Sequence, residues 1–132
     1  MERHASNAHY LAEKLEGNDK LKNMRYPFLP SHPQYAIAKK QMKNGGGIFC
    51  FELKGGLESG RRFLNSLQLL SRTANLGDTR SIASHPASTT HAKLSESERM
   101  AVNITSGLIR ISVGLEDRDD ILNDLLQALE AC

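Results

Sequence analysis

The chain has 132 residues, enough for about one domain with a single hydrophobic core and too few for a complete two-domain enzyme. Hydrophobic residues make up 39% and charged residues 24%, which excludes a disordered chain, and the formal charge of +2 comes from interleaved acids and bases without a basic track for nucleic acid. No apolar run approaches the roughly 20 residues of a membrane span and no signal-peptide core follows Met1, so we expect a cytoplasmic protein with no membrane partner.

Apolar residues at spacings of three and four predict a first helix from Glu2 to Leu15, which Gly17 ends. No Ser, Thr, Asp or Asn cap precedes this helix, so we interpret residues 1–16 as a linking helix that is truncated at its N-terminus. Three prolines make residues 26–33 a rigid turn, and Ser31 is expected to cap a second helix that runs to residues 44–45. We attribute Gly45-Gly46-Gly47 to helix termination, because a phosphate cradle would follow a strand instead.

The remainder of the chain predicts three strands and three further helices. Strands are expected at 48–53, 69–74 and 108–113, and helices at 57–67, after Ser95 and at 117–129. Ser95 and Glu98 form a capping box for the short helix between them. This order predicts an α+β protein with two layers, in which helices cover a small, mostly antiparallel sheet.

Arg110 lies inside the last predicted strand, between Ile109 and Ile111, where a guanidinium is costly to bury without an anion. One interpretation is that it pairs with an internal acid such as Glu52 or Asp78, or points outward from an edge strand. The other is that it receives a ligand carboxylate in two parallel hydrogen bonds. The segment Asn75-Leu76-Gly77 favours the second, because an amide and a glycine at the end of a strand offer donors and close backbone approach.

The remaining polar clusters have structural explanations. His85 and His91 have the wrong spacing for a metal site, so we expect no metal and predict that both imidazoles bind backbone groups. The hydroxyl groups of residues 88–90 are expected to satisfy the backbone of a proline-containing loop rather than supply a nucleophile. Cys50 lies in a strand-like run and Cys132 is the last residue, so two free thiols are expected.

Several ordered motifs resemble the C-terminal part of the pyridoxal-phosphate (PLP) enzymes of cysteine and methionine metabolism, the cystathionine γ-synthase family. They are Glu-Arg-His at 2–4, Ser-Asn-Ala at 6–8, Tyr-Pro-x-Leu-Pro-Ser-His-Pro-Gln at 26–34, Asn-Leu-Gly-Asp at 75–78, Ser-His-Pro-Ala at 84–87, Thr-His at 90–91 and Leu-Ile-Arg-Ile-Ser-Val-Gly-Leu-Glu-Asp at 108–117. The resemblance implies that residues 1–132 form the single C-terminal, small domain of a larger fold-type I enzyme that works as a homotetramer.

The resemblance also implies the site residues. Arg110 would hold the α-carboxylate of an amino-acid substrate, and Asn75, with Leu76 and Gly77 beside it, would approach the same group. The Schiff-base lysine and the residues that bind PLP would belong to the part of the enzyme that precedes this chain. We therefore expect no catalytic, cofactor-binding or metal-binding residue in residues 1–132, and no activity from these residues alone.

Within the family, Asn75-Leu76-Gly77-Asp78 is similar to the homoserine-ester sulfhydrylases rather than to members with Glu-Ser-Leu-Gly-Gly. This implies a transferase of trans-sulfuration and methionine biosynthesis, which replaces the acyl group of O-acetyl- or O-succinylhomoserine with sulfide to give homocysteine. A methionine γ-lyase or a cystathionine γ-synthase or lyase is the alternative within the family. Outside it, a stand-alone, non-catalytic module that binds a carboxylate or another protein is the third possibility.

Overall fold

The computed structural model describes residues 1–132, which form five α-helices, five strands and one short 3-10 helix. The helices are α1 (Glu2–Leu15), α2 (Tyr35–Gln41), α3 (Gly56–Ser66), α4 (Glu96–Ala101) and α5 (Arg118–Glu130), and the 3-10 helix η1 spans Pro86–Ser88. The strands are β1 (Leu21–Arg25), β2 (Ile48–Leu53), β3 (Ser71–Arg72), β4 (Ile82–Ser84) and β5 (Leu108–Ser112). They form one sheet in the order β1-β2-β5-β4-β3, in which only β3 and β4 run parallel. The predicted fold class is confirmed.

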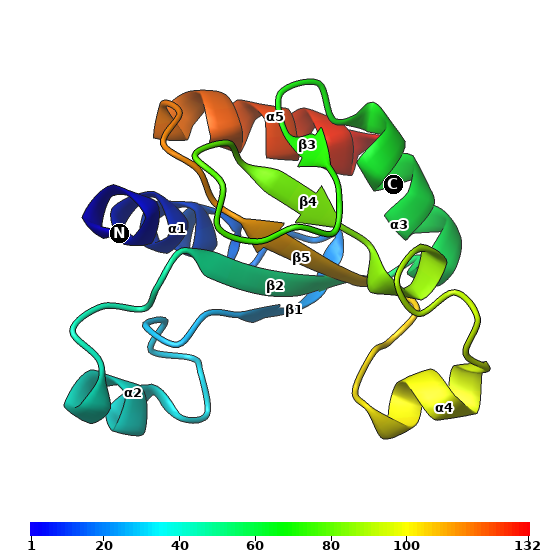
Figure 1. Cartoon of the computed structure of the whole chain (residues 1–132), viewed down its shortest axis with the longest axis horizontal. Coiled ribbons are helices and arrows are strands. Elements are labelled where there is room, and N and C mark those ends of the chain that lie inside the picture. The colour runs from blue at the N-terminus through cyan, green and yellow to red at the C-terminus, as the bar shows by residue number, and fades with distance from the viewer.

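Helices α1, α3 and α5 cover one face of the sheet, whereas α2 and α4 extend away on the other side (Figure 1). The core lies between the sheet and these three helices, because alternate residues of β2 and β5 point toward them. Its largest fully buried side chains include Phe49, Phe51, Phe63, Ile109 and Ile111. The opposite face of β5 is therefore free of the helical layer, and Arg110 lies on that face.

Two strands were not predicted, and one predicted strand is much shorter than expected. β1 has the polar sequence Leu-Lys-Asn-Met-Arg and a register shift near its start, so it lacks the alternation that identifies a strand. β4 falls between the strand expected at 69–74 and the helix expected after Ser95, and its three residues are too few to show a period. The strand expected at 69–74 is reduced to Ser71–Arg72, because a side chain from α5 accepts hydrogen bonds from the backbone N–H groups of the residues just before it.

That side chain is Asp124 of α5, which is buried in the interface with the segment before β3. Its carboxylate accepts hydrogen bonds from the backbone N–H groups of Gln68 at 2.8 Å, Leu69 at 2.9 Å and Leu70 at 3.0 Å. We expect Asp124→Asn to lower the free energy of unfolding by about 1 to 3 kcal/mol. The NH2 group of the asparagine is a donor, so it cannot accept the hydrogen bonds that these backbone N–H groups offer. Urea unfolding checks this, with the exposed Asp120→Asn on the same helix as the control; equal stability of the two variants would contradict it.

The second helix begins later than predicted. Ser31 does not cap it; the Ser31 hydroxyl donates to Glu16 instead, and Gln34 at the start of α2 provides no side-chain cap. The helix ends at Gln41, so helix termination does not explain the three glycines. Close packing explains Gly45, where a Cβ would lie 2.5 Å from the buried Tyr26 ring, and Gly46 has a positive φ of +77°, which favours glycine. The capping box of Ser95 and Glu98 is confirmed.

Candidate functional site

Arg110 lies at the centre of a row of side chains that crosses the uncovered face of the sheet. Its register partners are Cys50 on β2 and Ser84 on β4, and Cys50 in turn pairs with Arg25 on β1. Residues directly opposite one another across strands share a face. The row therefore carries two guanidinium groups and no carboxylate.

The guanidinium of Arg110 forms no ion pair within the chain. Its Nη2 donates to the backbone oxygen of Ala74 at 2.9 Å, while Glu52 pairs with Lys22 and Asp78 pairs with Arg80. The internal acid partners considered for Arg110 are thus wrong, and so is the edge-strand position, because β5 is the central strand. A half-buried cation with unused donors remains, which is the arrangement that an anionic ligand requires.

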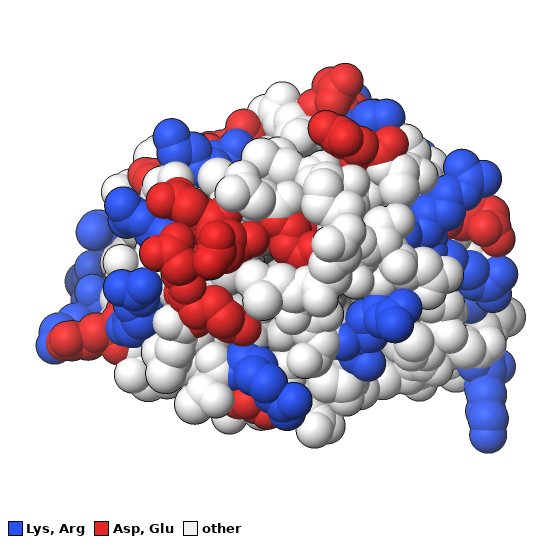
Figure 2. All heavy atoms as spheres, turned by 90° about the horizontal axis from the view of Figure 1, so that it is seen from above, with Lys and Arg blue, Asp and Glu red and all other residues white.

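The thiol beside Arg110 adds no negative charge. Burial raises the pKa of Cys50, and the nearby Arg110 and Arg25 only partly oppose that rise, so the thiol is neutral near pH 7. Both cysteines are free, as predicted. Acidic side chains gather instead over the helical side of the molecule, next to the start of α5, where Asp117, Asp119 and Asp120 lie (Figure 2). The row around Arg110 therefore carries positive charge, whereas acidic side chains gather at the start of α5.

The segment Asn75-Leu76-Gly77 lies beside Arg110, because the bond to Ala74 holds the start of this loop against the arginine. All three residues are exposed, and none of them forms a hydrogen bond within the chain. Gly77 has φ of +76°, a conformation that favours glycine. The contact of Arg110 with Ala74 thus places the start of the predicted segment next to the arginine, and the role of residues 75–77 in binding stays a prediction.

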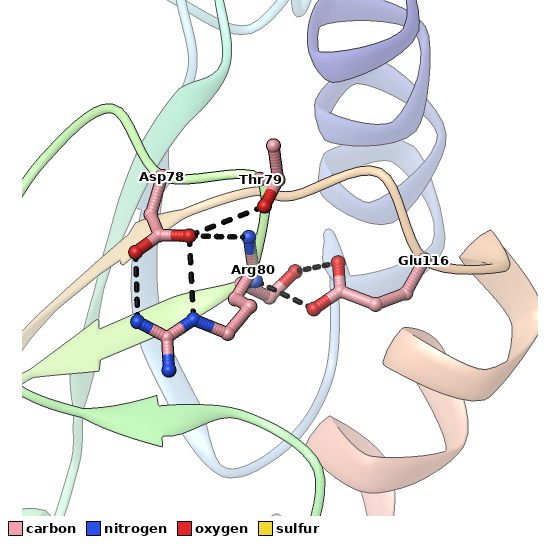
Figure 3. Close-up of polar contacts among 5 residues, drawn as sticks. Asp78, Thr79, Arg80 and Glu116 are labelled. Carbon is pink, nitrogen blue, oxygen red and sulfur yellow. Dashed lines mark hydrogen bonds and ion pairs between the residues drawn. The ribbon is translucent and has the colours of Figure 1, made fainter.

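Residues 79–81, which follow this loop, are hydrogen-bonded to the turn after β5 (Figure 3). The Thr79 oxygen accepts from the Leu115 N–H at 2.7 Å, and the Glu116 carboxylate accepts from the N–H and hydroxyl of Ser81 at 2.6 and 2.9 Å. A Cβ on Gly114 would lie 2.4 Å from the Thr79 oxygen, so only glycine permits this approach. The loop is therefore fixed relative to Arg110 at both of its ends.

Helix α1 supports the same turn from the other side. Asn7 is buried, and its side-chain amide donates to the backbone carbonyl oxygens of Gly114 and Glu116 at 3.2 and 3.0 Å. The His4 ring hydrogen-bonds the Val113 oxygen at 2.6 Å. The Ser-Asn-Ala motif in the first helix thus has a structural purpose, which is to hold the end of β5.

A cleft of about 550 Å³ opens next to this region, between the start of α1, the three glycines and the loop at 77–79. Arg110 does not line the cleft. Ser112 does, and it lies two residues further along the same face of β5. Arg110 is therefore adjacent to the cleft rather than inside it.

His85 is a fully buried brace between η1, α3 and the segment before β5. Its Nε2 lies 2.7 Å from the Ser106 oxygen, and its Nδ1 lies 2.8 Å from the Ser88 hydroxyl. The prediction that His85 binds a backbone group is confirmed. For His91 it is wrong, because that ring contacts the Thr90 hydroxyl. The Thr89 hydroxyl donates to the His85 oxygen, as expected of a proline-containing loop.

Burial lowers the pKa of His85, so the ring is neutral in the folded state where it would be protonated in the unfolded state. The unfolded state then binds more protons below about pH 6.5, and stability falls with falling pH until the folded pKa is passed. We expect the free energy of unfolding to decrease by up to about 1.4 kcal/mol per pH unit in this window. Denaturant unfolding between pH 5 and 7 measures the slope, and His85→Gln should flatten it.

None of the eight lysines is buried within this chain, whereas a lysine that forms a Schiff base is desolvated in a pocket. No group of three His, Cys, Asp or Glu side chains is arranged to hold a metal ion. None of the helices is long and apolar enough to cross a membrane.

A family model for Cys/Met metabolism PLP-dependent enzymes matches residues 1–130, and the chain belongs to this family. The chain is 52% identical over 131 residues to an L-methionine gamma-lyase of Pseudomonas putida, covering 99% of the chain and 33% of the relative. It is 47% identical to an O-acetyl-L-homoserine sulfhydrylase of Leptospira meyeri, covering 98% of the chain and 30% of the relative. The chain thus spans about a third of the length of these relatives.

A crystal structure described as an O-acetylhomoserine (thiol)-lyase of Campylobacter jejuni has the same fold. It superposes with a TM-score of 0.89 and 41% identity over 98% of this chain and 31% of that protein. That structure contains N′-pyridoxyl-lysine-5′-monophosphate. PLP is therefore the cofactor of the family to which the chain belongs.

Sequence reasoning missed the contacts that hold the site. The bond between Asp78 and the backbone N–H of Arg80 is typical of an Asx turn, so the Asp-Thr-Arg pattern could have predicted it. The pairing of Glu116 with Ser81 joins residues 35 positions apart, and no local pattern predicts it. Nor does any local pattern link Asn7 to the end of β5.

Proposed function

We propose that residues 1–132 are the C-terminal, substrate-binding domain of a PLP-dependent trans-sulfuration enzyme, in which Arg110 holds the α-carboxylate of the amino-acid substrate. The observation that carries this proposal is the guanidinium of the half-buried Arg110 on the uncovered face of the sheet, which has no acid partner and has unused donors. The planar fork of an arginine binds a carboxylate through two parallel hydrogen bonds. Asn75, Leu76 and Gly77 would cover the bound carboxylate from the adjacent loop.

The rest of the chemistry belongs to the longer protein. PLP supplies an electron sink when it is bound, and we assign no contact with it to this chain. Arg110 contributes binding and orientation, which fix the substrate relative to the reacting groups without moving a proton. We accordingly expect the domain to be inactive alone and the full-length enzyme to be a homotetramer.

For the reaction, we propose a homoserine-ester sulfhydrylase that forms homocysteine from an O-acyl-homoserine and sulfide. The resemblance of Asn75-Leu76-Gly77-Asp78 to such enzymes supports this choice, as does the 47% identity to the Leptospira meyeri relative. A methionine γ-lyase is the second candidate, because relatives named for that activity reach 52% and 50% identity. We place either reaction in the cytoplasm.

Product analysis of the full-length, PLP-loaded protein separates these candidates. It is incubated in parallel with O-acetylhomoserine and sulfide, with O-succinylhomoserine and sulfide, and with L-methionine alone. Homocysteine from one of the esters is expected. Production of a thiol and an α-keto acid from methionine, with no homocysteine from either ester, would instead support the lyase. Turnover of none of the three would contradict both candidates and favour a non-catalytic module.

A further inference from the structure

Asp78 and Arg80 form a two-pronged ion pair that the proposed function has not yet used. Arg80 Nη2 donates to Asp78 Oδ2 at 2.9 Å, and Arg80 Nε donates to Oδ1 at 3.3 Å (Figure 3). The same Oδ1 accepts from the backbone N–H of Arg80 at 3.0 Å. These hydrogen bonds hold the pKa of Asp78 well below its usual range, so the pair is charged at any pH near neutrality.

The pair lies between a part of the loop without hydrogen bonds, residues 75–77, and a part that is hydrogen-bonded to the turn after β5, residues 79–81. On one side, the Ala74 oxygen is bound to Arg110. On the other, Thr79 and Ser81 are bound to the turn after β5. Only residues 75–77 remain between the anchors without a hydrogen bond, and we call them the tip.

The geometry points to Asp78 and Arg80 as positioning residues that hold the tip over Arg110 for binding of the substrate carboxylate. This inference rests on the proposed function of Arg110. A tip that is held at both ends loses less conformational freedom when it closes on a ligand than a longer free segment does. Without the ion pair, residue 78 would be held only by its hydrogen bond from the backbone N–H of Arg80, so the tip would be less ordered before binding and each binding event would have to order it.

If Asp78 acted only through its charge, its replacement would change substrate binding in the opposite direction. Asp78 is an anion near a site for an anion, so its charge alone opposes binding and its removal would strengthen binding. If Asp78 positions the tip, its removal weakens binding. The direction of the change in KM for Asp78→Asn therefore separates the two roles. The asparagine has the same shape, and its amide oxygen can still accept the hydrogen bond from the backbone N–H of Arg80.

The experiment uses the full-length, PLP-loaded enzyme with the acylhomoserine or L-methionine that it converts. We expect Asp78→Asn and Arg80→Gln each to raise KM by about 3- to 10-fold, with kcat changed by less than about 2-fold. The double variant should resemble either single variant, because both remove one interaction. Arg80→Lys should also raise KM, since an ammonium cannot present two parallel donors.

Two controls match the changes in charge. Asp120→Asn removes an exposed carboxylate that forms no ion pair, and Arg72→Gln alters an exposed arginine whose guanidinium hydrogen-bonds only Asn65. Both should keep the KM of the unmodified enzyme. As a readout that does not depend on turnover, amide hydrogen exchange of the peptide covering residues 73–80 should be faster in Asp78→Asn and unchanged in the controls.

The outcomes distinguish this inference from the proposed function. A KM that is unchanged or lower in Asp78→Asn, or an Arg80→Lys variant equal to the unmodified enzyme, would overturn the positioning role. If Arg110→Ala raises KM strongly in the same assays, the carboxylate role of Arg110 survives that result. If Arg110→Ala has no effect either, the proposed function itself fails.

Discussion

Replacement of Arg110 by alanine in the full-length enzyme is expected to lower kcat/KM for its amino-acid substrate by roughly 30-fold or more. The loss corresponds to about 2 to 5 kcal/mol, because a desolvated carboxylate would be left without its charged partner. No other cation in the row can replace it at the same place, since Arg25 lies two strands away on β1. Steady-state kinetics of the variant measures the effect.

Two further variants test whether geometry or charge is responsible. Arg110→Lys keeps the charge but loses the planar fork, so it should also be impaired. Arg25→Ala removes an exposed guanidinium from the same face and should change kcat/KM by much less. If Arg110→Ala retains unchanged kinetics, the role proposed for Arg110 is wrong. If Arg25→Ala is as damaging as Arg110→Ala, the site depends on total charge rather than on one side chain.

Gly60→Ala is expected to destabilise the fold by about 2 to 5 kcal/mol, although alanine is normally favoured inside a helix. A Cβ on Gly60 of α3 would lie 2.3 Å from Nε2 of His85, which is fully buried. The ring would have to move and would lose its contact with the Ser106 oxygen. Thermal or urea unfolding of the variant measures the loss.

A double-mutant cycle provides the control for Gly60→Ala. His85→Ala alone should destabilise the chain, because it leaves a cavity and an unpaired carbonyl. In the His85→Ala background, the Gly60→Ala change should cost little or be stabilising, since the clash is gone and alanine favours the helix. Equal costs in both backgrounds would show that the contact with His85 is not the reason for glycine at position 60.

The sequence predicts those elements of the fold that have a clear periodicity. Helices α1, α3 and α5 and strands β2 and β5 lie where apolar spacing places them, because they bury a continuous stripe or an alternate row of side chains. β1 and β4 are defined by their neighbours instead. β4 has only three residues, and it becomes a strand because β5 offers free backbone groups beside it.

For the candidate site, the sequence predicts the cation but not its support. A charged residue between two isoleucines in a strand is unusual by itself, and the prediction that it needs an anion follows from the cost of burial. The contacts that hold the loop involve Asn7, Ser81 and Glu116, which are far apart in the chain. Such contacts depend on the tertiary fold, and no local pattern of residues contains them.

Both outer strands of the sheet make poor templates for the addition of a foreign strand. β3 has only two residues, and β1 has a register shift between Leu21 and Asn23, with Lys22 at that irregularity. Short, irregular or charged borders of this kind discourage uncontrolled pairing between protein molecules. The fold can therefore leave one broad face of its sheet uncovered by helices without promoting aggregation through the outer strands.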